Sequence, residues 1–146
     1  MPVHPFIVHF GIAFTWLAGA LYALNVLMKE SFCSNQQVFY LHLAGVGGIG
    51  AAILSGLSAK EGIVLTAAAE LPLKWQQIWA YATVWLMGLL AIWAYLRMKR
   101  WQKLENVLFV GIFLLSCVLM SVGTHMGGKM VYEEGVGVSV NTITNE

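Results

Sequence analysis

Four long uncharged stretches dominate the pattern of hydrophobic and polar positions along the chain, and short charged segments separate them. Each stretch has about the 20 residues that an α-helix needs to cross about 30 Å of hydrocarbon. Because lipid offers no hydrogen-bond partner to the backbone, helices are the natural structure for such stretches. The pattern therefore predicts four membrane-spanning helices, at Phe6–Met28, Val38–Ala59, Ile78–Leu96 and Val107–Thr124.

The composition supports this fold class. Of the 146 residues, 59% are hydrophobic and 10% are charged, whereas soluble domains carry about 25% charged residues. The mean hydropathy is +0.73. We expect one all-α domain over residues 1–146, an integral membrane four-helix bundle with both termini on the same side, followed by an extramembrane tail at 127–146. The net charge of +1 gives no argument for binding nucleic acid.

Polar and conformationally special residues indicate where the spans end. Pro5 suits the first position of a helix, where a missing N–H costs nothing, so His4 is expected just outside the first span. The connection Ile63–Trp75 contains a proline, and its apolar piece Val64–Ala69 is too short to cross, so we expect it at the membrane interface. After Gly127-Gly128 the chain is expected to leave the bilayer.

Basic residues are unevenly distributed between the two sides of this bundle. Five of the eight lie on the side opposite the N-terminus, and most of these are clustered between the third and fourth spans. Loops rich in lysine and arginine tend to stay in the cytoplasm. We therefore expect both termini in the periplasm and the protein in a bacterial inner (cytoplasmic) membrane. The clustered residues are Arg97, Lys99, Arg100 and Lys103.

The second span contains a glycine pattern, Gly45-Val46-Gly47-Gly48-Ile49-Gly50, that matches dinucleotide-binding loops. Such a loop joins a strand to a helix inside a βαβ unit, whereas two further membrane-length apolar stretches follow here. In a membrane helix, small residues let neighbouring helices approach closely. We therefore interpret the small residues of this span as packing residues: Ala44, Gly45, Gly47, Gly48, Ala51 and Ala52.

Three of the four histidines gather on the N-terminal side of the predicted bundle. His9 lies about one turn inside the first span, His4 precedes that span, and His125 ends the fourth. His4 and His9 are five residues apart, about 140° around a helix, so they cannot share one helical face. Ionisable groups inside membrane spans are costly and often functional. These three histidines are therefore the best candidate site, whereas His42 lies on the other side without a histidine partner.

Three interpretations of the three histidines are open. The imidazoles can be interfacial groups that hydrogen-bond to loops and lipid headgroups. His9 and His125, at matching depth, can instead ligate the iron of a b-type haem between helices; Gly11 and Gly123 then leave room for the macrocycle. Together with His4 they can also bind zinc or copper, although their spacing matches no compact metal-binding signature.

Both ends of the chain resemble motifs of a known family. The opening, His4-Pro5-Phe6-Ile7-Val8-His9-Phe10-Gly11-Ile12-Ala13, and the segment 123–138 resemble the first and last motifs of a family of small bacterial four-helix membrane proteins, domain of unknown function 2231. Members are similar to membrane modules joined to c-type cytochrome domains, which implies an electron-transfer site facing the periplasm. Gly11 stands where relatives have proline. Trp75-Gln76-Gln77 stands where relatives often have a histidine, and Gln77 can donate a hydrogen bond there.

The histidines and the family resemblance suggest two functions. The first is a small membrane electron-transfer subunit with one haem b, in which His9 and His125 are axial ligands supported by His4 and Gln77. Its partner would be a periplasmic cytochrome c or a quinone. The second is a non-catalytic accessory subunit of a larger respiratory or photosynthetic complex, without its own cofactor. Metal transport is disfavoured because the middles of the spans offer few polar groups.

Groups for catalysis are scarce in the spans. No paired carboxylates occur there, so we expect no catalytic activity of its own. Cys33 and Cys117 are expected at different depths, as free thiols.

Overall fold

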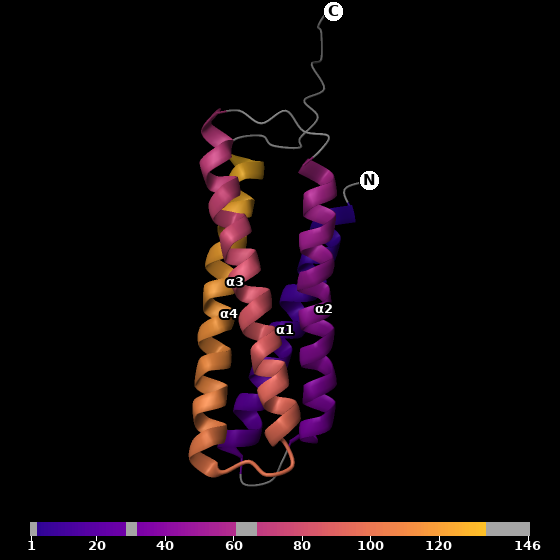
Figure 1. Ribbon diagram of the computed structural model, residues 1–146, viewed down its shortest axis with the longest axis vertical. Coiled ribbons are helices and arrows are strands. Elements are labelled where there is room, and N and C mark those ends of the chain that lie inside the picture. Colours follow the sequence, from indigo (N-terminus) through magenta and orange to yellow (C-terminus); the bar gives the residue numbers. More distant parts are fainter. Residues whose placement is uncertain (1–2, 29–31, 61–66, 134–146) are drawn as a thin grey trace, which may run out of the picture.

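The computed structural model describes residues 3–28, 32–60 and 67–133, and in these ranges the chain forms four long helices (Figure 1). They are α1 (Val3–Leu27), α2 (Asn35–Lys60), α3 (Ala67–Arg97) and α4 (Lys103–Tyr132). All four are long and apolar enough to cross a membrane. The prediction of an all-α membrane four-helix bundle is therefore confirmed.

Each helix packs against two others, in a closed square. α1 contacts α2 and α4, and α3 contacts the same two helices. The starts of α1 and α3 lie at one end of the bundle with the finishes of α2 and α4 (Figure 1, top). We call this the His4 end, and the opposite end the Arg97 end. The predicted up-and-down order, with the first helix beginning and the fourth helix ending at the same end, is confirmed.

Several helix boundaries differ from the prediction, because polar residues, prolines and glycines do not by themselves end a helix. The predicted connection 63–75 is wrong from residue 67 onward, since α3 begins at Ala67; residues 61–66 lie outside the described part of the chain. Pro72 lies near the start of α3 and removes only one backbone hydrogen bond. His4 lies inside α1 rather than just outside it, and Pro5 is the third residue of the helix instead of the first. At the third position the missing N–H of Pro5 has no helical partner anyway.

The fourth helix does not end at Gly127-Gly128 but continues to Tyr132. Glycine inside a helix costs up to about 1 kcal/mol relative to alanine. At Gly127 this cost has a reason, because a side-chain Cβ there would overlap the amide of Gln76 on α3. Of the tail predicted at 127–146, residues 134–146 lie outside the described part of the chain.

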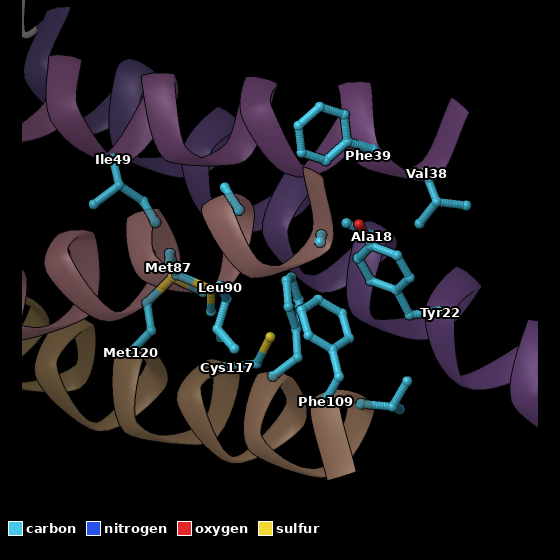
Figure 2. Close-up of a cluster of buried hydrophobic side chains, with 14 residues drawn as sticks. Ala18, Tyr22, Val38, Phe39, Ile49, Met87, Leu90, Phe109, Cys117 and Met120 are labelled. Carbon is cyan, nitrogen blue, oxygen red and sulfur yellow. The ribbon is translucent and has the colours of Figure 1, made fainter. Parts of the chain in front are cut away.

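The hydrophobic core occupies the half of the bundle nearer the Arg97 end (Figure 2). Tyr22 packs edge-on against Phe109 and Phe113, with ring centroids 5.1 and 5.4 Å apart. His42 is fully buried beside Phe113, and its Nε2 donates to the Met87 carbonyl at 3.1 Å. The side chains of all four helices interdigitate here, so this half holds the bundle together.

The predicted thiols are confirmed: Cys33 and Cys117 are both free. Cys117 is buried within the core, whereas Cys33 precedes α2 at the Arg97 end. The two residues therefore lie at different depths.

Glycines bring α1 and α2 into backbone contact. A Cβ on Gly48 would lie 2.7 Å from the Gly11 Cα, and one on Gly45 would lie 2.6 Å from the Thr15 hydroxyl. Gly47, on another face of α2, has no neighbour within 4 Å of its Cβ position. The packing role predicted for the small residues of α2 is therefore confirmed at Gly45 and Gly48.

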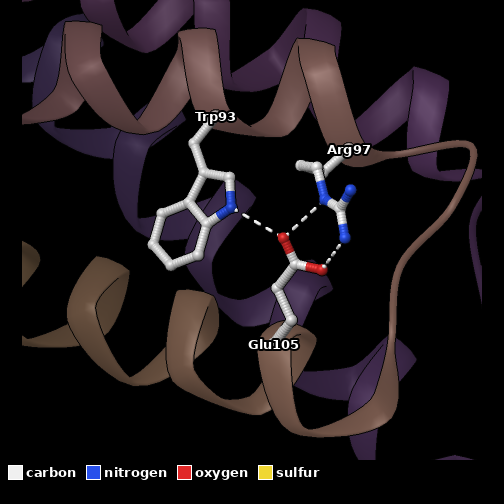
Figure 3. A network of polar contacts seen from close by, with 3 residues as sticks. All are labelled: Trp93, Arg97 and Glu105. Carbon is white, nitrogen blue, oxygen red and sulfur yellow. Dashed lines mark hydrogen bonds and ion pairs between the residues drawn. The ribbon is translucent and has the colours of Figure 1, made fainter.

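A polar network ties α3 to α4 at the Arg97 end (Figure 3). The Arg97 guanidinium donates two hydrogen bonds to the Glu105 carboxylate, each 2.7 Å long. Trp93 donates a third from its indole N–H at 3.0 Å. Paired bonds of this kind fix direction as well as distance, so the network sets the angle at which the chain turns from α3 into α4.

Candidate functional site

A cavity of about 160 Å³ lies between the four helices at the His4 end. Ile49 and Met120 belong both to its lining and to the core, so they form its floor. Figure 1 shows the reason for the space: α3 lies beside α2 near the Arg97 end and diverges from it toward the His4 end. A dry cavity of about 150 Å³ holds a molecule the size of benzene. This cavity therefore has room for one six-membered ring.

His4 is the imidazole that faces this cavity. Its Nδ1 lies 2.8 Å from the Ser55 hydroxyl on α2, and its ring lines the cavity. The absence of a side chain at Gly56 makes space for the ring, since a Cβ there would lie 2.9 Å from the His4 Cε1. Two residues of α2 thus hold the imidazole in a defined position.

Four further side chains with an amide or an aliphatic hydroxyl group line the cavity. The Thr124 hydroxyl of α4 donates to the Ser121 carbonyl at 3.0 Å. The other three come from α3 and are the amides of Gln76 and Gln77 and the hydroxyl of Thr83. None of these three has a hydrogen-bond partner among the described side chains and backbone groups. The rest of the lining is mostly apolar, so these groups stand out as free donors in an otherwise hydrophobic space.

The cavity reaches the flank of the bundle between α2 and α3. Leu57 and Tyr81 both line it, and they remain 41% and 43% exposed. Both residues belong to membrane-spanning segments. The mouth of the cavity therefore faces the bilayer rather than only the aqueous phase.

The structure brings some of the predicted site residues together. His4, Gln77 and Gly123 all line the cavity, although they come from three different helices. His9 and His125 lie at the same end of the bundle but are exposed and do not line it. The Nδ1 of His9 instead contacts the Pro5 carbonyl of its own helix. The 140° between His4 and His9 thus turns one imidazole inward and the other outward.

The room predicted for a macrocycle beside Gly11 and Gly123 is filled by neighbouring helices. A Cβ on Gly11 would lie 2.9 Å from the backbone of Gly48, and one on Gly123 would lie 2.7 Å from the Trp79 Cβ. The cavity itself matches one small ring and does not fit a porphyrin. Ligation of haem by His9 and His125 therefore stays a prediction, and any such haem would lie on the outer faces of α1 and α4.

The described residues contain no group of three or more His, Cys, Asp or Glu side chains placed to hold a metal ion. The zinc or copper site considered for His4, His9 and His125 consequently finds no support in this part of the chain.

Several residues of this site were not singled out from the sequence. Gln76, Trp79, Thr83 and Gly56 line the cavity, and Ser55 contacts His4. The spacing of residues along α2 and α3 could have identified part of this set of lining residues. Positions 76, 80 and 83 follow the spacing of one helical face, as do 49, 52, 53 and 56. That spacing groups residues on a face, but only packing shows that the two faces meet.

Comparison with known proteins identifies the family to which the chain belongs. No curated protein matches the chain, and no solved structure matches it either. A family described as "Predicted membrane protein (DUF2231)" matches residues 1–140. Since that match spans nearly the whole chain, the resemblance of its two end motifs is confirmed, and the protein belongs to this family of predicted membrane proteins.

Proposed function

We propose that this protein is a small membrane subunit that binds one lipophilic molecule in the cavity at the His4 end. The observation that carries the proposal is the pairing of apolar walls with four polar groups that lack partners: the amides of Gln76 and Gln77, the Thr83 hydroxyl and one nitrogen of His4. Each of these groups can still form a hydrogen bond, which contributes about 0.5–1.5 kcal/mol. A ligand with oxygen atoms supplies the partners, while its ring fills the apolar space.

The ligand reaches the cavity from the bilayer. Its mouth lies between Leu57 and Tyr81, on the membrane-facing flank. Sites for small molecules are typically apolar with a few polar groups that fix orientation, and this cavity has that character.

Extraction of the purified protein tests the proposal. Protein taken up in a native membrane patch and washed is expected to release about one equivalent of a lipophilic ring compound, which mass spectrometry of the organic extract identifies. Bulk phospholipid alone, with no compound enriched over the surrounding membrane, would contradict the proposal.

Electron transfer is the second candidate function, and the position of the histidines favours it. His9 and His125 are exposed at the same end of the bundle as the cavity. A b-type haem held there would exchange electrons with a periplasmic cytochrome c or with a larger membrane complex. The expected absorption spectrum has a Soret band and, after reduction, split α and β bands. His9→Ala or His125→Ala should remove them. A colourless preparation that lacks partner polypeptides argues against this function and leaves the ligand cavity untouched.

We further propose that the His4 end faces the periplasm of a bacterial inner membrane. Support comes from Lys99, Arg100 and Lys103, which lie at the Arg97 end, because basic loops favour the cytoplasmic side. In a Cys33→Ser background, a membrane-impermeant maleimide is expected to label Glu70→Cys in cells with a permeabilised outer membrane. Ser34→Cys, at the opposite end, should react only after lysis. Cys117 is buried and contributes little background. The reverse labelling order would invert the orientation.

A further inference from the structure

The contacts of His4 favour one of its nitrogens, Nε2, as a hydrogen-bond acceptor. The Ser55 hydroxyl donates its single hydrogen to the Ala52 carbonyl at 3.0 Å. In this arrangement the hydroxyl accepts from the imidazole across the 2.8 Å contact, and Nδ1 of His4 carries the proton. The opposite arrangement, with the hydroxyl donating to Nδ1, would leave the Ala52 carbonyl without this bond. A neutral imidazole carries one N–H, so the lone pair is on Nε2. Among the described residues, nothing donates to that atom.

The wall of the cavity formed by α3 carries hydrogen-bond donors, which complement the acceptor nitrogen of His4. The amides of Gln76 and Gln77 come from α3, and Gly127 of α4 leaves the space that the Gln76 amide occupies. Each amide offers two N–H donors. A ligand that spans the cavity therefore meets an acceptor on the α1 side and donors on the α3 side.

The shape and the mouth of the cavity restrict the ligand further. Its volume of about 160 Å³ suits one six-membered ring. Trp79 and Tyr81 contribute aromatic side chains to the lining, and aromatic rings pack well against one another. Since the mouth opens toward lipid between Leu57 and Tyr81, an alkyl substituent can remain in the bilayer while the ring enters.

We propose that the cavity selects the reduced form of a lipophilic aromatic alcohol of the hydroquinone type. The ligand donates one O–H to Nε2 of His4, and its second oxygen accepts from the amide of Gln76 or Gln77. The oxidised quinone has a carbonyl oxygen in place of that O–H, so it would face the His4 lone pair with a second acceptor. This inference rests on the proposed ligand-binding function and names its substrate class.

Selection of the reduced form has a redox consequence. A site that binds hydroquinone more tightly than quinone raises the reduction potential of the bound couple. Tenfold selectivity corresponds to about 30 mV for a two-electron couple. The bound molecule would then accept electrons more readily than the same molecule free in the membrane.

Three matched probes test the inference under anaerobic conditions: an alkyl hydroquinone, the corresponding quinone and the hydroquinone dimethyl ether. Equilibrium dialysis against the full-length protein in lipid nanodiscs gives the three dissociation constants. The hydroquinone is expected to bind about tenfold more tightly than the other two, because one hydrogen bond contributes about 1–1.5 kcal/mol and 1.4 kcal/mol is a factor of ten. Equal affinities, or a preference for the quinone, would overturn the inference.

Two variants locate the selectivity at His4. His4→Ala removes the acceptor, and Gly56→Ala places a methyl group 2.9 Å from the ring and displaces it. Both are expected to bind hydroquinone and ether with equal affinity, and continued binding of the ether shows that the bundle is folded. Gly50→Ala, on the same helix with no neighbour within 4 Å of its Cβ, is the control and should keep the selectivity. Selectivity that survives in His4→Ala contradicts the role of this residue.

The tautomer can be read without any ligand. In protein labelled with ¹⁵N-histidine, the His4 signals, assigned by their loss in His4→Ala, are expected to show a protonated Nδ1 and an unprotonated Nε2. A protonated Nε2 would overturn the inference. If no probe binds at all and no ring compound is extracted, the proposed function fails as well. Binding without selectivity removes only the inference about the reduced form.

Discussion

Gly48→Ala is expected to destabilise the bundle by about 1–3 kcal/mol, the usual cost of forcing extra atoms into a packed interior. The new Cβ would lie 2.7 Å from the Cα of Gly11. Backbone atoms of α1 cannot rotate away as a side chain can, so the two helices must separate. Separation would disturb every contact between α1 and α2 beyond this crossing, which places the effect toward the upper end of that range.

Gly47→Ala is the matched control for this substitution. It lies one position away on the same helix, but its Cβ position has no neighbour within 4 Å. Alanine is the better helix former by up to about 1 kcal/mol, so this variant should be unchanged or slightly more stable. Thermal unfolding of both variants in the same detergent, followed by circular dichroism, gives the comparison. Equal melting temperatures for the two would mean that the close crossing of α1 and α2 contributes nothing to stability.

Ala52→Phe is expected to abolish ligand binding while the bundle stays folded. Ala52 lines the cavity, and a phenyl ring added there occupies the same space as a bound six-membered ring. The floor of Ile49 and Met120 belongs to the core half of the molecule, which the substitution leaves in place. We therefore expect at least a tenfold loss of affinity for the lipophilic probe and a melting temperature close to that of the parent protein.

The neighbouring residue provides the control for this experiment too. Ala51 is exposed on the outside of α2, so Ala51→Phe adds the same ring to the lipid-facing surface. Binding should be unchanged in this variant, by dialysis of the probe or by extraction of the native compound. If Ala52→Phe binds as the parent does, the ligand lies elsewhere. If both variants lose binding together, the loss reflects a general effect of added bulk on α2 and not the cavity.

The four helices were predictable because each apolar segment must form a helix in lipid, independently of the other segments. A run such as 107–124 cannot leave backbone groups unpaired in lipid, whatever its neighbours are. The boundaries were less predictable. Polar residues at 70–77 interrupt the apolar run of α3, yet they continue the helix, and Gly127-Gly128 looks like a terminus although α4 passes through it. Hydropathy reports contact with lipid, whereas a helix ends only where its hydrogen bonds end.

The candidate site was predictable only in its depth. Counting spans places the three histidines and Gln77 at one end, and the structure confirms that common end. The number and order of the spans do not predict which of the imidazoles faces the inside of the bundle. His4 lines the cavity and His9 does not, because the rotation of α1 is set by the contact of Gly11 with Gly48. A sequence without the neighbouring helix carries no information about that rotation.

The pattern of apolar segments is enough to predict a membrane bundle of four antiparallel helices, since the length of each segment and the short connections between successive segments can be read along the chain. The packing of the helices against one another makes α3 diverge from α2 at the His4 end, brings Gln76 and His4 into the lining of one cavity, and makes Gly11 and Gly123 packing positions. The reason is physical. Partition into lipid is a sum over the residues of one segment, whereas a cavity is what remains when several helices have found their closest mutual packing.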